Sequence, residues 1–146
     1  MKLDNIGFYT LSDHRARTAH KLSPLSRCEL LITRKCNFSC PYCRSVGQEL
    51  TLDQVKKTVL LWRSMGLKNI RFSGGEPTLN MPSLVSGVVT AKGCDHIAVS
   101  TNGSADSSTY KLLVELGAND FSISLDACCS SVGDKLAGRD GMFERI

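Results

Sequence analysis

The sequence predicts an α/β fold built on one parallel sheet. Two observations carry this prediction: short apolar runs alternate with segments of helical periodicity, and the chemically distinctive residues all follow the apolar runs. Alternation at this spacing is typical of βαβ units with right-handed crossovers. The length of 146 residues suits one domain. The expected strands are residues 28–33, 69–73, 96–101 and 120–125, and the expected helices are residues 52–65, about 80–92, and 107–116.

The first predicted strand, Cys-Glu-Leu-Leu-Ile-Thr, leads directly into the cysteine loop, Cys-Asn-Phe-Ser-Cys-Pro-Tyr-Cys, at residues 36–43. This loop holds Cys36, Cys40 and Cys43. Thiolates are the usual ligands of iron–sulfur clusters and of structural zinc. Three thiols with no fourth beside them indicate a metal site with one open position, which catalytic sites keep and structural sites close.

The first two helices have clear start and stop signals. Thr51 and Gln54 form a capping-box pattern, and Gly66 is placed to end that helix. The second helix is expected to begin near Asn80 with Pro82 in its first turn. The apolar residues expected to face the core from the first helix are Leu52, Val55, Val59, Leu60 and Trp62.

Period-two alternation in the strands predicts a polar face. In residues 121–126, Phe, Ile and Leu alternate with Ser, Ser and Asp, and in residues 70–73, Ile and Phe alternate with Arg71 and Ser73. Helices must cover the apolar face. A closed eight-stranded barrel fills its interior with apolar side chains, so a polar face instead predicts an open sheet curved around a ligand cavity.

Four polar or reactive segments follow the four strands: the cysteine loop, Gly-Gly-Glu-Pro at residues 74–77, Asn102 with Gly103, and Asp126. In parallel sheets the functional loops lie beyond the carboxyl ends of the strands. We therefore expect these segments to meet at one rim.

The two ends of the chain are less regular. Residues 1–27 have no clear period and are interpreted as an N-terminal extension to a core domain of residues 28–146. The tail from Ser130 contains helix-forming pieces, and residues 141–146 have the composition of the first turns of a helix.

The composition is typical of a soluble protein in a reducing compartment. The net charge of +4 includes no block of like charge, so binding to nucleic acid or to a membrane surface is not indicated. The N-terminus lacks the apolar core of a signal peptide, and no apolar run is long enough to cross a bilayer. These features predict a cytoplasmic location, where seven cysteines favour metal or redox chemistry over disulfides.

Other interpretations of the cysteines remain open on the residues alone. Cys40 and Cys43 enclose two residues, as in a glutaredoxin-like thiol–disulfide oxidoreductase. A zinc-binding structural module would need Cys28, His14 or His20 as a fourth ligand. The cysteines outside the loop are interpreted as packing residues rather than as further metal ligands: Cys28, Cys94, Cys128 and Cys129.

Taken together, the motifs resemble the radical S-adenosylmethionine (SAM) superfamily. The matching features are the spacing of Cys36, Cys40 and Cys43, an aromatic residue before the last cysteine, Gly-Gly-Glu-Pro after the second strand, and Ser-Leu-Asp at residues 124–126. The sequence around the cysteine loop is most similar to that of the branch that contains the GTP cyclase of molybdenum-cofactor biosynthesis. This resemblance implies a partial (β/α)6 barrel, truncated to about four βα units, with later SAM contacts and any second cluster beyond Ile146.

The resemblance also implies the cofactors. The three cysteines would hold a [4Fe–4S] cluster whose fourth iron chelates SAM, and an electron from a reductant such as flavodoxin or ferredoxin would cleave SAM to a 5′-deoxyadenosyl radical. The radical would take a hydrogen atom from a substrate. The residues expected to contact SAM are Tyr42 (adenine), Gly74 and Gly75 (methionine end), Glu76 (ammonium), Ser124 (carboxylate), Asp126 (ribose) and Asn102.

The substrate is less well defined. Arg71 matches an arginine that contacts the nucleotide in the cyclase branch, whereas Glu29 stands where that branch has another arginine. A carboxylate at this position would repel a triphosphate. The resemblance is therefore compatible with a peptide or another small molecule as much as with GTP.

Overall fold

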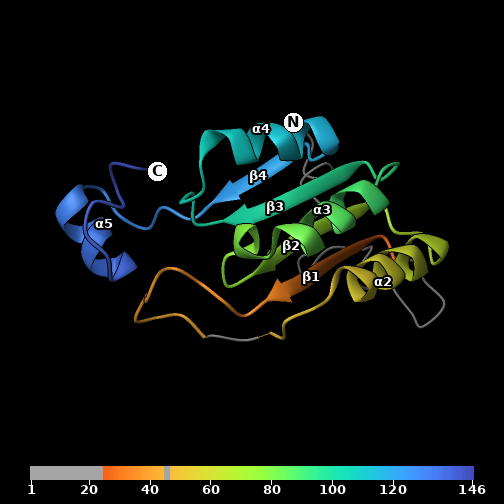
Figure 1. Cartoon of the computed structure of the whole chain (residues 1–146), viewed down its shortest axis with the longest axis horizontal. Coiled ribbons are helices and arrows are strands. Elements are labelled where there is room, and N and C mark those ends of the chain that lie inside the picture. Colours follow the sequence, from red (N-terminus) through yellow and green to blue (C-terminus); the bar gives the residue numbers. More distant parts are fainter. Residues whose placement is uncertain (1–24, 45–46) are drawn as a thin grey trace, which may run out of the picture.

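A four-stranded sheet forms the centre of the computed structural model, which describes residues 25–44 and 47–146 (Figure 1). Its strands pair in the order β1-β2-β3-β4, and every neighbouring pair is parallel, as predicted. The last strand ends at Ile123 rather than at Leu125. The strands are β1 (Arg27–Thr33), β2 (Asn69–Gly74), β3 (His96–Thr101) and β4 (Asp120–Ile123).

Residues 1–24 lie outside the described residues, and with them most of the predicted N-terminal extension. His14 and His20, considered above as zinc ligands, belong to this part of the chain.

Three helices lie on one face of the sheet, and the last helix lies beyond the ends of the strands (Figure 1). A short 3-10 helix follows the Gly-Gly-Glu-Pro turn, and residues 141–146 form turns instead of a regular helix. No helix in the described part of the chain is both long and apolar enough to span a membrane. The helices are α2 (Leu52–Ser64), η2 (Pro77–Asn80), α3 (Met81–Thr90), α4 (Ser107–Leu116) and α5 (Ser130–Ala137).

The start of α2 forms as the capping box predicts. The Thr51 hydroxyl accepts from the Gln54 N–H at 3.3 Å, and the Gln54 side chain accepts from the Thr51 N–H at 2.9 Å. The predicted apolar face is only partly right. Leu52 and Leu60 are 48% and 47% exposed, because the face that meets α3 and the sheet is narrower than the sequence pattern suggests.

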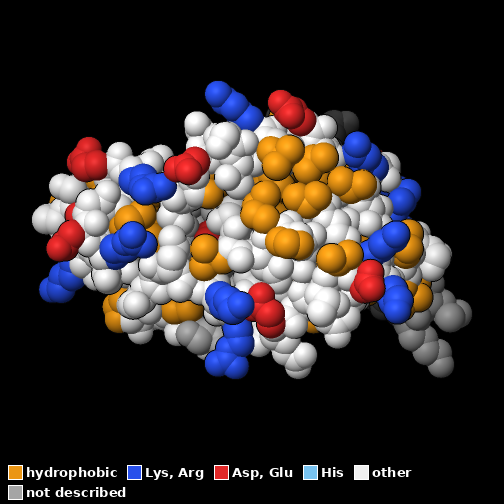
Figure 2. All heavy atoms as spheres, viewed as in Figure 1, with side chains coloured by type: hydrophobic (Ala, Val, Ile, Leu, Met, Phe, Trp, Pro, Cys, Tyr) orange, Lys and Arg blue, Asp and Glu red, His pale blue; other side chains and the backbone are white. Residues whose placement is uncertain are grey.

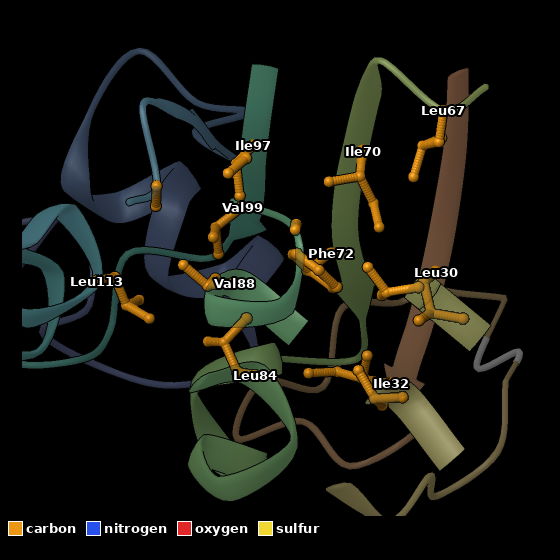
Figure 3. Close-up of a cluster of buried hydrophobic side chains, with 14 residues drawn as sticks. Leu30, Ile32, Leu67, Ile70, Phe72, Leu84, Val88, Ile97, Val99 and Leu113 are labelled. Carbon is orange, nitrogen blue, oxygen red and sulfur yellow. The ribbon is translucent and has the colours of Figure 1, made fainter. Parts of the chain in front are cut away.

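The core lies between the sheet and the helices on that face (Figure 3). Alternate residues of β1, β2 and β3 point into it, which satisfies the period-two pattern. The buried members are Leu30, Ile32, Ile70, Phe72, Ile97 and Val99 from the strands, with Val55, Val59, Leu84, Val88 and Leu113 from the helices.

The opposite face of the sheet carries the polar set. Ser73 and Ser100 from this face, with Ser124 just past β4, line a cavity at the carboxyl ends of the strands. Phe121 packs against the core, as its parity predicts. The polar, cavity-facing side of the sheet is therefore confirmed for β2 and β3. The prediction is wrong for the end of the fourth strand, where Ile123 and Leu125 are 54% and 50% exposed and Leu125 lines the cavity beside Ser124, because β4 ends at Ile123 and no described helix covers this end.

Candidate functional site

Two adjoining hollows, of about 210 and 310 Å³, lie beyond the carboxyl ends of the strands. Both are lined by the three thiols of the cysteine loop and by the double-glycine turn. The first is also lined by Tyr42, Asn102, Ser124 and Asp126. The structure thus brings four segments that are far apart in sequence to one rim, as predicted.

Two residues predicted for the site, Arg71 and Glu76, do not line either hollow. Arg71 lies on the polar face of β2, between Glu29 of β1 and Ala98 of β3 in the sheet register. Its Nε atom is buried without a hydrogen-bond partner. A buried guanidinium nitrogen without an acceptor marks a place where an anionic group would be stabilised.

The double-glycine turn is fixed against the start of the cysteine loop. The Gly75 N–H donates to the Thr33 carbonyl at 2.8 Å, and the next N–H, that of Glu76, donates to the Lys35 carbonyl at 2.7 Å. A Cβ atom on Gly74 or Gly75 would lie 2.2 Å from these two carbonyl oxygens, respectively. The glycines are therefore required by contact with this protein's own backbone; their expected contact with SAM stays a prediction.

Glu76 is completely buried, and both carboxylate oxygens are hydrogen-bonded. One oxygen accepts from the Thr78 N–H at 3.0 Å and from the Thr101 hydroxyl at 2.9 Å. The other accepts from the Asn102 N–H at 2.7 Å. In this conformation Glu76 ties the turn after β2 to the end of β3. Direct contact with an ammonium group would require the groups that cover Glu76 to move, because its side chain is completely buried.

Cys36, Cys40 and Cys43 surround a common hollow. The Cys43 N–H donates to the Cys40 carbonyl at 3.0 Å, which closes a turn between the second and third cysteines of the loop. Burial is the main cause that raises the pKa of the Cys36 thiol.

Among the described residues, no three His, Cys, Asp or Glu side chains converge as ligands of a single metal ion. A [4Fe–4S] cube spreads its thiolates over different irons and so needs wider spacing than a single ion. Three thiols that line one hollow match the donor set of a cluster that keeps one position open.

The two alternative interpretations of the cysteines fare less well. Cys28 packs against the hydrophobic core, where burial raises the pKa of its thiol, and it lies at the opposite end of β1 from the cysteine loop. Thioredoxin-type dithiols lower a thiol pKa by placing it at a helix N-terminus. In the described residues the helix that follows the cysteine loop begins at Leu52, so no described helix has its N-terminus at Cys40 or Cys43.

Tyr42 and Asp126 meet across the mouth of the cavity. The Tyr42 hydroxyl donates to the Asp126 carboxylate at 2.9 Å. Desolvation, followed by this hydrogen bond, raises the pKa of Tyr42. The bond joins the cysteine loop to the segment that follows β4, and both side chains lie where a nucleoside could rest on them.

The cavity has an apolar wall that the sequence reasoning missed. The backbone of the cysteine loop is joined to α5, because the Ser39 N–H donates to the Ala137 carbonyl at 2.8 Å. The Asp134 carboxylate accepts from the N–H groups of Gly141 and Phe143 at 2.7 and 2.9 Å, which holds the tail in place. The sequence contained one signal for this wall, the adjacent apolar residues Met142 and Phe143 in an otherwise mostly polar tail. The wall consists of Phe38, Leu136, Ala137, Met142, Phe143 and Ile146.

The remaining cysteines do not join the site. Cys94 packs against the core, as predicted. Cys128 and Cys129 do not line the cavity, but the expectation that they are packing residues is wrong: both are exposed, with sulfur atoms 3.7 Å apart, in the segment between β4 and α5.

Comparison with known proteins is consistent with this geometry. The model of the Radical SAM superfamily matches residues 30–146. The GTP 3',8-cyclase of Tolumonas auensis is 29% identical over 94% of this chain and 42% of its own length. That of Chlorobaculum tepidum is 32% identical over 80% of this chain and 37% of its own length. The chain thus spans about two fifths of the length of these curated relatives.

Among solved structures, SuiB of Streptococcus suis bound to precursor peptide SuiA has a similar fold. Its TM-score is 0.63 at 16% identity, covering 83% of this chain and 28% of that protein.

Proposed function

The chain belongs to the radical SAM superfamily, an enzyme family, and we propose that it binds a [4Fe–4S] cluster through Cys36, Cys40 and Cys43, with SAM in the adjoining cavity. The observation that carries the proposal is that three thiols, the double-glycine turn and the residues after β4 line one hollow. When bound, these cofactors supply reductive cleavage of SAM and a 5′-deoxyadenosyl radical that takes a hydrogen atom from the substrate.

The residues of the chain bind and orient. Cys36, Cys40 and Cys43 would hold three irons of the cluster and would leave one position open for the amino and carboxylate groups of SAM. The Ser124 hydroxyl is proposed to donate to that carboxylate, and Gly74 and Gly75 to present backbone groups to the methionine end. Tyr42 and Asp126, already joined at the cavity mouth, are proposed to contact the adenine and the ribose.

The apolar wall excludes water from the reacting centre. Phe38, Met142, Phe143 and Ile146 line the cavity from two separate segments. Removing water protects a reactive radical from side reactions and strengthens the polar contacts that hold the cofactor.

The proposed substrate carries an anionic group. The Nε atom of Arg71 is buried without a hydrogen-bond partner on the polar face of the sheet, which supports this. Glu29, its neighbour on β1, disfavours a triphosphate at that position. The relatives are GTP cyclases and the structural neighbour holds a precursor peptide. We therefore propose a small molecule or peptide, and a reductant such as flavodoxin or ferredoxin. Free thiols and a cluster suit a reducing compartment such as the cytoplasm.

Anaerobic reconstitution with iron and sulfide tests the proposal. We expect a brown protein with about four irons per chain that converts SAM to methionine and 5′-deoxyadenosine when reduced. Cys36→Ala should lose the iron. The matched control Cys94→Ala removes a thiol that packs against the core and should keep it.

A colourless protein that reduces mixed disulfides, with that activity retained in Cys36→Ala, would overturn the proposal in favour of thiol–disulfide exchange through Cys40 and Cys43.

A further inference from the structure

We propose that Asn102 is a positioning residue for Cys36: its side-chain amide donates a hydrogen bond to the Cys36 sulfur, and it thereby orients this thiolate and raises the reduction potential of the cluster that the thiolate ligates. The Asn102 Nδ2 atom lies 3.7 Å from the Cys36 Sγ atom. The inference rests on the proposed function, because it concerns the electronic tuning of the same cluster.

The orientation of the Asn102 amide follows from its partners. Its Oδ1 atom accepts from the backbone N–H of Ser104 at 3.0 Å, and a backbone N–H can only donate. The oxygen must therefore face Ser104, which turns the NH₂ group toward Cys36. One of its two hydrogens is directed to the sulfur, and the other to the side-chain oxygen of Asn37 at 2.9 Å.

Asn37 completes a clamp around this amide. Its Oδ1 atom accepts from Asn102, and its own NH₂ group donates to the Ser104 hydroxyl at 2.8 Å. Because Asn37 follows Cys36 directly in sequence, the clamp ties the first cluster ligand to the loop after β3 by two independent side-chain bonds.

The backbone at Asn102 is held as firmly as its side chain. Its N–H donates to the completely buried carboxylate of Glu76 at 2.7 Å. The hydroxyl of Thr101 donates to the other oxygen of the same carboxylate at 2.9 Å and accepts from the Gly103 N–H at 3.1 Å. A donor fixed on both sides loses little conformational entropy when it binds the sulfur.

Hydrogen bonds to ligand sulfurs help to set the potential of iron–sulfur clusters. The Cys36 sulfur accepts from two N–H groups, those of Phe38 at 3.4 Å and of Asn102 at 3.7 Å. Both stabilise negative charge on the thiolate. A reduced cluster carries one more negative charge than an oxidised one, so these donors favour reduction.

A redox titration of the reconstituted cluster, followed by electron paramagnetic resonance, tests the inference. In Asn102→Ala we expect one-electron reduction to become about tenfold less favourable, a midpoint potential about 59 mV lower. The matched control is Asn119→Ala. Asn119 also bridges backbone groups, accepting from Ile97 N–H and donating to the Asp95 carbonyl, but at the opposite end of the strands. The midpoint potential of the cluster in Asn119→Ala should equal that of the wild type.

A second variant covers the case in which Asn102→Ala does not retain iron. Asn37→Ala leaves Asn102 in place but removes one side of the clamp, and its potential should shift in the same direction by a smaller amount. The inference would be overturned if a variant that retains four irons per chain has the midpoint potential of the wild type. That result would leave the proposed function intact. A wild-type protein that forms no cluster would instead overturn the proposed function.

Discussion

At the scale of single residues, Gly75 shows how the site depends on a missing side chain. The position of the double-glycine motif after a strand predicted a role in the site. The expected reason for two glycines there was the close approach of SAM to the backbone. The structure adds a different reason. The nearest atoms to an added Cβ belong to the backbone of Lys35, immediately before Cys36, the first of the three proposed cluster ligands.

We expect Gly75→Ala to displace the start of the cysteine loop. An added Cβ would lie 2.2 Å from a carbonyl oxygen that has little freedom to move. Overpacking of this kind costs about 1–3 kcal/mol. Urea unfolding should report the loss of stability, and the iron bound per chain should fall.

The control is Gly141→Ala, where an added Cβ has no neighbour within 4 Å and only the positive φ of 73° is strained. It should bind iron normally. Equal iron contents in the two variants would contradict the role assigned to the turn.

Asp134 makes the apolar wall sensitive to acid. Hydrogen bonds from the N–H groups of Phe143 and Gly141 lower the pKa of this carboxyl below its usual 3.8. A carboxyl with a lowered folded pKa contributes stability above its unfolded value and loses that contribution as the pH falls through the folded value. We therefore expect hydrogen-exchange protection of those two amides at neutral pH and its loss in acid below pH 3.8.

Asp134→Asn should weaken the same protection at neutral pH. Asp140→Asn, which changes a neighbouring exposed carboxyl, is the control. Protection that is independent of pH and of Asp134 would show that the tail is held by its apolar contacts alone.

At the scale of elements, α2 shows which features of a helix the sequence can predict. Its start was predicted correctly because the capping box is a local pattern of two residues. Its buried face was predicted too wide, because burial depends on which neighbouring helix and strand it meets. Helical spacing alone could not distinguish Val59, which is completely buried, from Leu60, which is 47% exposed.

Val59→Ala and Leu60→Ala form a matched pair on adjacent positions of α2. Deleting buried methyl groups costs both transfer free energy and a cavity, so we expect Val59→Ala to lower the free energy of unfolding by about 2 kcal/mol. Leu60→Ala should change it by less than about 0.5 kcal/mol. Urea unfolding measures both, and similar losses in the two variants would mean that the packing of α2 differs from the one described.

At the scale of the whole molecule, β4 is the last strand of the sheet in the described residues, and exposed apolar side chains lie on this strand and on two of the helices that cover the sheet. Figure 2 shows hydrophobic side chains gathered over α3 and α4. The exposed members on these helices include Val89, Leu112 and Val114, and Ile123 on β4 is 54% exposed. Unpaired strand edges beside apolar patches favour association.

We expect this 146-residue chain to self-associate or to be poorly soluble. Light scattering coupled to gel filtration should give a mass above the 15.9 kDa of one chain. Ile123→Lys should shift the distribution toward the monomer, whereas Leu61→Lys, which changes an exposed residue of α2, should not. A monodisperse wild-type monomer would contradict this expectation.

The same scale shows how much of the site was predictable. Strand order and the rim of functional loops followed from the alternation of elements, because parallel strands place their carboxyl ends together. The bond between Tyr42 and Asp126, and the clamp on Cys36, could not be predicted. Both sets of hydrogen bonds join residues that are far apart in sequence. No local sequence pattern indicates which side chains from different loops come into contact.

The central claim is that three thiolates bind a four-iron cluster and leave one iron open to SAM. Mössbauer spectroscopy of protein reconstituted with ⁵⁷Fe tests it most directly. We predict that SAM will change the signal of about one iron in four, because only the iron without a cysteine ligand can bind it. A spectrum that SAM leaves unchanged, or one of a cluster with four equivalent irons, would contradict the account.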